Sequence, residues 1–273
     1  MPTRRFSGHR LGRELVCALG LAAGAVTLSA DSTGDSGWQD LREWRFSEAM
    51  RSFERVADEP ASRLGHAVAL LNLQPRTADA LACAEQELAA LAEDASVSTD
   101  LSVAARYLLA RIAEVHAFKP DPARAVELYG ALLVSHPQHP LAQGALAKLA
   151  TLRLYRLGSE PLSTLAALEP MGRQLTEPGA RRDFHLVLGR SYLFFGGERR
   201  RALEHLEAAL AAGVVTPTVR GDLLVQIGEL ARELNQPATA RKVWNEFIRT
   251  FLRDPRADLI RQRLESLPAE VLP

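Results

Sequence analysis

Residues 44–56 read WRFSEAMRSFERV, and residues 237–247 read PATARKVWNEF. Each stretch has an alanine, a large aromatic residue four positions later, and another apolar residue three positions after that. These residues are Ala49, Phe53 and Val56 in the first stretch, and Ala240, Trp244 and Phe247 in the second. This spacing puts the three side chains on one face of an α-helix, where the alanine lets a neighbouring helix approach closely.

Related patterns occur three more times between these two stretches. They are centred on Ala125, on Ala202 and, in a weaker form, on Ala80. An amphipathic segment precedes four of the five helices, and these segments are residues 64–73, 101–118, 183–195 and 221–234. We therefore expect helices in antiparallel pairs, in which each pair covers the apolar face of the next one.

The composition agrees with an all-α protein. Hydrophobic residues make up 47% of the chain and aromatic residues only 6%, with alanine and leucine dominating, a mixture that favours helices over sheets. Lys+Arg and Asp+Glu are equal at 33 each, so no net positive charge draws the chain to nucleic acid. Cys83 lies in an alanine-rich stretch and is expected to be a buried, unreactive thiol.

The first thirty residues have the order of an export signal. Four arginines precede an apolar stretch over residues 15–28, small residues follow at Ser29 and Ala30, and an acidic run begins at Asp31. This pattern predicts a signal peptide over residues 1–30, cleaved after Ala25 or Ala30, and a periplasmic or cell-envelope protein. A membrane tether through an uncleaved leader and an organellar transit peptide are the alternatives. The apolar stretch is short for a stable membrane-spanning helix.

The helix pairs resemble the tetratricopeptide repeat (TPR) family, in particular the degenerate repeats of bacterial cell-envelope proteins. The last pair fits the family pattern best, with Gly228, Ala240, Trp244 and Phe247 in register. The resemblance covers residues 36–266 and implies a right-handed superhelical solenoid of antiparallel helix pairs over residues 31–267. Residues 156–180 fit poorly, contain a short expected helix over 162–168, and are interpreted as a decayed repeat or a hinge.

The resemblance also implies that the first helix of each pair lines a concave groove. Members of the family bind a protein or peptide partner in such a groove, without a cofactor. The polar residues at the corresponding positions of this sequence are Tyr107, Arg111, Glu114, Asp183, Arg190, Asp222, Glu229 and Arg232.

Motifs typical of enzymes and of metal sites give little support for either function. The sequence has no glycine-rich phosphate loop, nucleophile elbow, HExxH or paired CxxC. His136 and His139 are three residues apart, as metal ligands can be, but Pro137 and Pro140 place them in a turn without an obvious third ligand, which indicates a loop more than a metal site. The sequence thus predicts a non-catalytic exported scaffold. The alternatives are an accessory platform for a cell-wall or envelope enzyme, and an enzyme with a site near His66 or His185.

Overall fold

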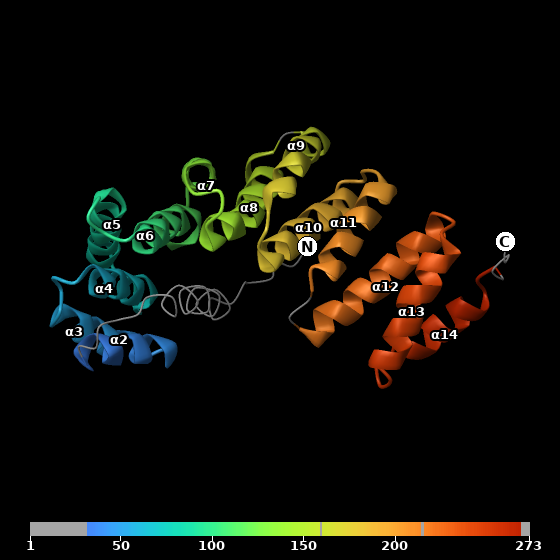
Figure 1. Ribbon diagram of the computed structural model, residues 1–273, viewed down its shortest axis with the longest axis horizontal. Helices are drawn as coiled ribbons and strands as arrows, with labels where there is room; N and C mark the ends of the chain where they lie inside the picture. Colours follow the sequence, from blue (N-terminus) through green and yellow to red (C-terminus); the bar gives the residue numbers. More distant parts are fainter. Residues whose placement is uncertain (1–31, 159, 214–215, 269–273) are drawn as a thin grey trace. The chain divides into compact units, whose positions relative to one another are not determined.

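A computed structural model describes residues 32–268 except 159 and 214–215 (Figure 1). The described residues form thirteen α-helices and no β-strand, so the all-α prediction is confirmed. The predicted signal peptide, residues 1–30, lies outside the described residues. The chain divides into two compact units: unit 1 ends at Ala142, and unit 2 begins at Gln143. This division falls before the predicted hinge at residues 156–180.

Within its described residues, from Ser32 onward, unit 1 contains six complete helices. These are α2 (Ser32–Arg42), α3 (Phe46–Glu54), α4 (Pro60–Asn72), α5 (Ala78–Glu93), α6 (Thr99–Arg111) and α7 (Pro122–Ser135). A π-helical turn, η1 (Ile112–His116), extends α6. Consecutive helices pack against each other, and the apolar faces of α2 to α6 form one core that includes Phe53, Leu88 and Leu108.

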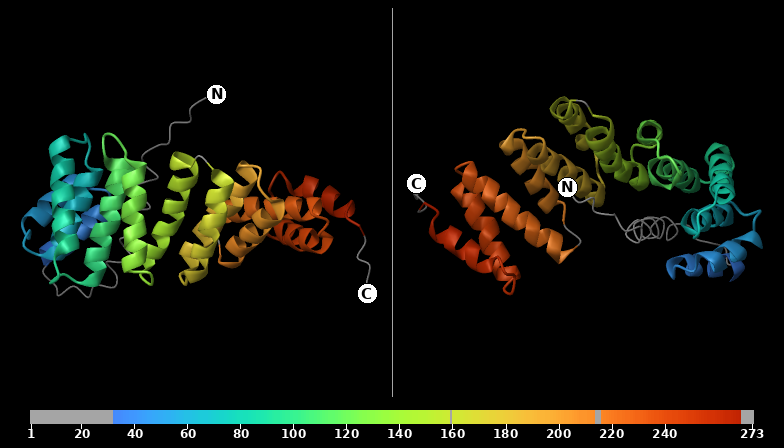
Figure 2. Two further views of the ribbon diagram at one scale, coloured as in Figure 1. Left: turned by 90° about the horizontal axis from the view of Figure 1, so that it is seen from above. Right: turned by 180° about the vertical axis from the view of Figure 1, so that it is seen from behind.

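Helix α8 (Pro140–Leu152) spans the division, and unit 2 contains the remaining helices. These are α9 (Pro161–Leu168), α10 (Pro178–Phe194), α11 (Arg199–Ala211), α12 (Pro217–Glu233), α13 (Pro237–Thr250) and α14 (Ala257–Glu265). A π-helical turn η2 (Arg153–Leu157) and a 3₁₀-helix η3 (Glu169–Gln174) flank α9. Figure 2 shows the pairs α10 with α11 and α12 with α13 lying side by side.

Local sequence signals start and stop the helices. Prolines occupy the first turn of many of them, where the missing N–H costs nothing. The side chains of Thr77 and Thr216 cap α5 and α12 by accepting hydrogen bonds from backbone N–H groups. Helix α10 ends at Phe194, and Gly196 follows with φ of +70°. Glycine adopts this left-handed backbone conformation without steric cost, so it suits the turn that follows the helix.

Close packing within the pairs depends on glycines that face large side chains. A Cβ atom on Gly37 of α2 would lie 2.7 Å from the ring of Phe53 on α3. A Cβ atom on Gly228 of α12 would overlap the indole of Trp244 on α13, and both aromatic side chains are fully buried. In each case the glycine precedes the aromatic residue by sixteen positions. The same spacing therefore gives the same contact in the first and the last major pair.

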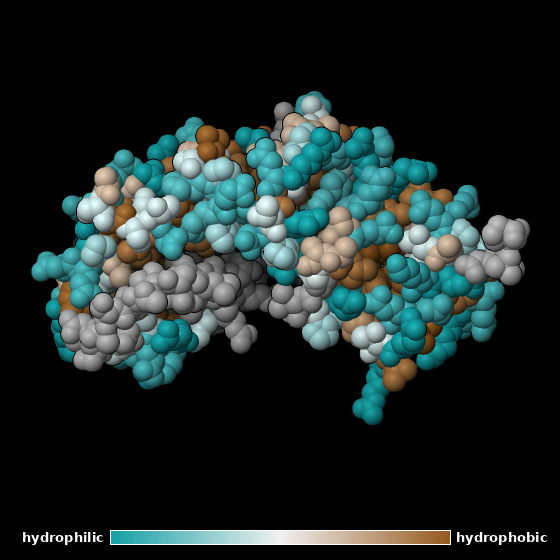
Figure 3. Space-filling view, viewed as in Figure 1, coloured by the Kyte–Doolittle hydropathy of each residue, from teal (hydrophilic) through white to brown (hydrophobic). Residues whose placement is uncertain are grey.

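The surface in Figure 3 is mainly hydrophilic, with smaller hydrophobic areas. None of the described helices combines the length and the apolar character needed to cross a membrane. Cys83 is exposed on α5, so the prediction that it is buried is wrong. The alanines around it do not enclose it, because the apolar face of α5 turns Ala84 and Leu88 inward instead.

Candidate functional site

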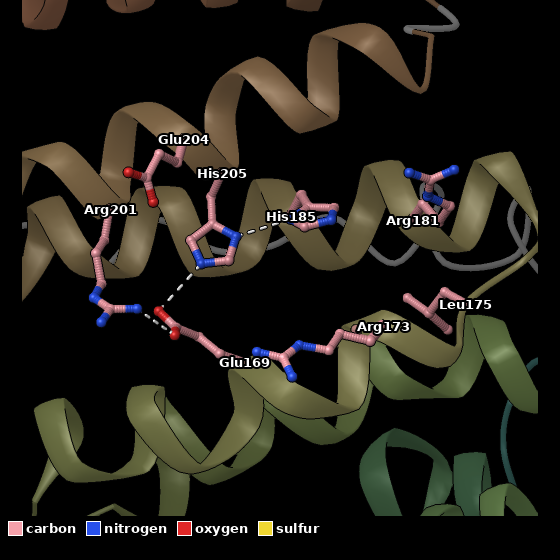
Figure 4. Close-up of a pocket in the computed structure, with 9 residues that line it drawn as sticks. Glu169, Arg173, Leu175, Arg181, His185, Arg201, Glu204 and His205 are labelled. Atoms are coloured by element: carbon pink, nitrogen blue, oxygen red, sulfur yellow. Dashed lines mark hydrogen bonds and ion pairs between the residues drawn. The ribbon is translucent and has the colours of Figure 1, made fainter.

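A cleft in unit 2 is lined mainly by ionisable side chains, and these come from separate segments of the sequence. It has a volume of about 500 Å³ and lies between η3, α10 and α11 (Figure 4). Its lining consists of Glu169, Gly172, Arg173, Leu175, Arg181, His185, Arg201, Glu204 and His205. Helix α10 packs closely on α11, which sets the two histidines opposite each other.

Glu169, at the start of η3, is held from three sides. The hydroxyl of Tyr192 donates a hydrogen bond to its Oε1 over 2.5 Å, and Nη1 of Arg201 donates to its Oε2 over 2.6 Å. Nε2 of His205 lies 3.4 Å from Oε1. Burial raises the pKa of Glu169, but these hydrogen bonds and the charge of Arg201 outweigh it, so the net shift is downward. Glu169 is therefore ionised and neutralised by Arg201.

His205 and His185 extend the chain of hydrogen bonds that begins at Glu169 into the cleft. Nδ1 of His185 lies 2.8 Å from Nδ1 of His205, and the ring of His205 stacks on Tyr192. The proton positions follow from the partners. An ionised Glu169 only accepts, so Nε2 of His205 carries a proton and its Nδ1 accepts from Nδ1–H of His185. Nε2 of His185 then remains as an acceptor.

Both histidines of the cleft are neutral at physiological pH. Burial, the nearby His205 and the charge of Arg181 lower the pKa of His185 to about 4. Burial lowers the pKa of His205 more than Glu169 raises it. The positive charge of the cleft thus comes from its arginines, while His185 offers a lone pair.

Two of these arginines, Arg173 and Arg181, have exposed side chains. Within the described residues neither has a hydrogen-bond or ion-pair partner, whereas Arg201 is paired with Glu169 and Glu198. Figure 4 shows Arg173 on η3 and Arg181 on α10, on opposite elements of the cleft. Their guanidinium groups are available to an anionic ligand.

The structure places the predicted partner-binding residues of unit 1 in one network. Arg111 is only 2% exposed, and its Nη1 donates to Oε2 of Glu114 over 2.6 Å. The hydroxyl of Tyr129 donates to the same oxygen over 2.6 Å, and the ring of Tyr107 packs against Tyr129. Arg111 thus makes its contacts inside unit 1, and a role in binding a partner stays a prediction.

The predicted residues of unit 2 lie on α10 and α12 and do not form a single cluster. Arg190 is exposed, and Asp183 is bonded to Arg182. Asp222 pairs with Arg256. Glu229 and Arg232 pair with each other, and Glu229 also pairs with Arg263. None of these five residues lines the cleft described above.

The sequence indicated His185 as a candidate site residue in the enzyme alternative, but it gave no indication of the partners of His185. Glu169 and His205 are 36 residues apart, and no local spacing signals their contact. The segment that carries Glu169 and Arg173 fitted the repeats poorly, so it received no functional role. The poor fit of this segment to the repeat pattern was the only feature of the sequence that set it apart from the other helices.

Unit 1 holds the one group of metal-ligating side chains found among the described residues. It consists of His66 on α4 with Cys83 and Glu87 on α5, whose ligand atoms lie within 4.8 Å of one another. The hydrogen bond to Glu87 raises the pKa of His66 more than burial lowers it. Burial, followed by the charge of Glu87, raises the pKa of the Cys83 thiol.

Comparison with known proteins gives no relative: no protein-family model matches the chain, and no curated protein is significantly similar to it.

Proposed function

We propose that this chain is a non-catalytic, exported scaffold of TPR-type helix pairs that binds an acidic segment of a partner protein in the cleft of unit 2. The repeat assignment is supported by the packing of Gly37 on Phe53 and of Gly228 on Trp244, at identical spacing. Gly189 packs similarly on Leu206 in the α10–α11 pair. Repeats of this kind stack as a right-handed solenoid and present side chains on their concave face.

The observation that carries the binding proposal is the pair of unpartnered arginines in the cleft, Arg173 and Arg181. A guanidinium group binds a carboxylate through two parallel N–H···O hydrogen bonds. Glu169 does not satisfy them, because Arg201 and Tyr192 already hold it. An aspartate or glutamate side chain of a partner, or a C-terminal carboxylate, supplies the missing anion.

His185 adds a second element of recognition. Its Nε2 is an acceptor while the ring is neutral, so it suits a backbone N–H of the bound segment. A peptide combines a carboxylate with a nearby N–H, whereas a fully ionised inorganic anion such as sulfate has no donor. The histidine thus favours a protein segment over a small anion.

Binding of a labelled acidic peptide tests this proposal. Fluorescence anisotropy would compare a peptide rich in Asp and Glu with its Asn and Gln counterpart. We expect Arg173→Gln and Arg181→Gln each to weaken binding of the acidic peptide about tenfold, the effect of losing one charge-assisted pair. His185→Gln retains an acceptor and is expected to weaken it less.

Arg190→Gln is the matched control, because Arg190 is an exposed arginine on the same helix, α10, outside the cleft. It is expected to leave binding unchanged. Loss of binding in Arg190→Gln alone would favour the site inferred from the repeat resemblance. Equal binding of both peptides, or no effect of Arg173→Gln and Arg181→Gln together, would contradict an acidic ligand in the cleft.

The other two interpretations of the sequence give different results in other assays. An accessory platform is expected to change the rate of a cell-wall or envelope enzyme when the two are mixed. An enzyme is expected to turn over substrate by itself, with His185 as the general base, and His185→Gln would then abolish turnover. Mass spectrometry of the N-terminus of the protein from its host tests the predicted export.

A further inference from the structure

Three side chains of unit 1 meet on the surface between two helices. His66 comes from α4, and Cys83 and Glu87 lie four residues apart on α5, one helical turn from each other. Nδ1 of His66 is 2.9 Å from Oε1 and 3.0 Å from Oε2 of Glu87. Sγ of Cys83 is 4.0 Å from Oε1 of Glu87. An imidazole, a thiol and a carboxylate therefore face one small volume.

We propose that His66, Cys83 and Glu87 bind a zinc ion, with water or another small ligand in the fourth position. Around a tetrahedral zinc ion with ordinary bond lengths, neighbouring ligand atoms are about 3.3 to 3.6 Å apart. The separations in unit 1 run from 2.9 Å to at most 4.8 Å. Changes in separation of about 1.5 Å or less, within reach of side-chain rotation, therefore bring the three atoms to zinc distances.

A fourth residue supports the site from the other side of the imidazole. Oε1 of Glu54, the last residue of α3, lies 3.8 Å from Nε2 of His66. Histidines that bind zinc through one ring nitrogen usually donate the other N–H to a carboxylate, which fixes the tautomer and the ring orientation. Glu54 thus stands where a supporting carboxylate is needed, and it lies on a third helix.

The chemistry of the ligands selects the ion. Thiolate and imidazole ligands favour zinc, whereas magnesium and calcium prefer oxygen ligands alone. A thiolate and a carboxylate also balance the charge of a divalent cation. Cys83 is exposed, so an ion reaches the site from solvent. Three protein ligands with one open position match zinc sites that accept a further ligand.

Metal titration of the full chain tests this proposal. A Cys17→Ser background leaves Cys83 as the only thiol. After treatment with a chelator, zinc would be titrated against a chromophoric competitor, and cobalt would be used as a spectroscopic probe. We expect one zinc ion per chain and a thiolate-to-cobalt charge-transfer band in the near ultraviolet.

Variants of the proposed ligands should then distinguish zinc binding at this site from nonspecific zinc binding. Cys83→Ser should remove the charge-transfer band. Cys83→Ser and His66→Asn should each weaken zinc binding by more than about 100-fold, because even outer-shell partners contribute about 10- to 100-fold. The loss of zinc affinity in Glu54→Gln should fall within the range of about 10- to 100-fold that is typical of outer-shell residues. Far-ultraviolet circular dichroism would verify that each variant is folded.

His139→Asn is the matched control, since it removes a histidine of the same unit whose Nε2 contacts Asp100. It should bind zinc like the parent chain. A cobalt complex without the band, or zinc binding that Cys83→Ser and His66→Asn leave unchanged, would overturn the proposal. The residues of the cleft in unit 2 take no part, so either outcome leaves the peptide-binding proposal intact.

Discussion

In unit 1, Gly37 of α2 makes room for the buried ring of Phe53 on α3. In unit 2, Gly228 of α12 makes room for the buried indole of Trp244 on α13. The two units therefore use the same packing device, in which a glycine without a side chain lets a large aromatic residue approach the backbone. One histidine of each unit, His66 in unit 1 and His185 in unit 2, shows the opposite: their pKa values are shifted in opposite directions.

The contrast is clearest between His66 and His185, each of which lies on one helix of a packed pair. Nδ1 of His66 faces Glu87, 21 residues later, and this carboxylate raises the pKa of His66. Nδ1 of His185 faces His205, 20 residues later, and burial together with this second imidazole lowers the pKa of His185 to about 4. Similar placement thus gives opposite charge preferences, because burial and the partner on the second helix decide the charge.

Removing the aromatic residues should have the largest effect and tests whether the two packing sites are equivalent. We expect Phe53→Ala and Trp244→Ala each to lower the free energy of unfolding by about 3 to 5 kcal/mol, because each leaves a cavity in the core. Urea unfolding measures the loss, and hydrogen exchange locates it in unit 1 or unit 2.

Val134→Ala is the control for this comparison, because Val134 is 84% exposed. It should change the free energy of unfolding by no more than about 0.5 kcal/mol. A loss of stability in only one of the two aromatic variants would show that the shared spacing of glycine and aromatic residue does not mean shared packing.

The acid stability of unit 2 should show the next largest effect. The pKa of His185 is lowered to about 4, against about 6.5 in the unfolded chain. The unfolded chain therefore binds the proton first, so the contribution of His185 to stability falls as the pH drops below about 6.5, and this loss is complete below about 4. Since His185 is partly exposed, we expect the free energy of unfolding to fall by about 2 kcal/mol, which is less than the full pKa shift of His185 implies. His205 adds to it in the same direction.

The fluorescence of Trp244 in a Trp38→Phe, Trp44→Phe background reports the unfolding of unit 2 at each pH. His185→Gln should flatten the dependence on pH, because its amide does not titrate. Arg190→Gln should keep it. An unchanged dependence in His185→Gln would assign the acid sensitivity of unit 2 to other groups.

The smallest effect is expected from His66, and its sign is opposite. Because the pKa of His66 is raised in the folded state, the stabilisation is fully present below the unfolded value of about 6.5. This stabilisation is lost as the pH rises through the higher pKa that His66 has in the folded state. We expect less than about 1 kcal/mol for this partly exposed pair.

Unfolding would be followed in a chelator through Trp38 and Trp44, in a Trp244→Phe background. Burial lowers the pKa of His116, also in unit 1, to about 4, so this histidine loses stability as the pH falls and opposes the gain. The gain is therefore read as the difference in stability between the parent and Glu87→Gln, which should grow as the pH falls toward about 6.5. The difference between the parent and Glu127→Gln, on the exposed surface of α7, should not change. A difference for Glu87→Gln that is the same at every pH would contradict the assignment to the His66–Glu87 contact.

Much of the fold could be predicted because helix pairs leave a local signature. The alanine and aromatic positions identified α3 and α13, and the expected helix over 162–168 corresponds to α9 (Pro161–Leu168). Helix α8 (Pro140–Leu152) was not identified. Its buried residues include Ala142, Ala145, Leu146, Leu149 and Ala150, so it has little polar face to produce a helical period.

The candidate sites were much less predictable, because their members come together only in the folded chain. The exposure of Cys83 and the burial of Arg111 depend on which face of α5 and α6 the neighbouring helices cover. Residue spacing within one helix does not determine that choice. His185 was named as a candidate from its place on an expected helix, but its contact with His205 was not identified.

The sequence alone determined that this chain forms paired helices, because the contacts that define a helix and its apolar face lie within a few residues of each other. Only the tertiary structure decided which ionisable groups meet. Glu169, His185 and His205 come from three separate elements, and Glu54, His66 and Glu87 from three others. Their protonation and ligand-binding properties arise from distances and burial that exist only after the helices have packed.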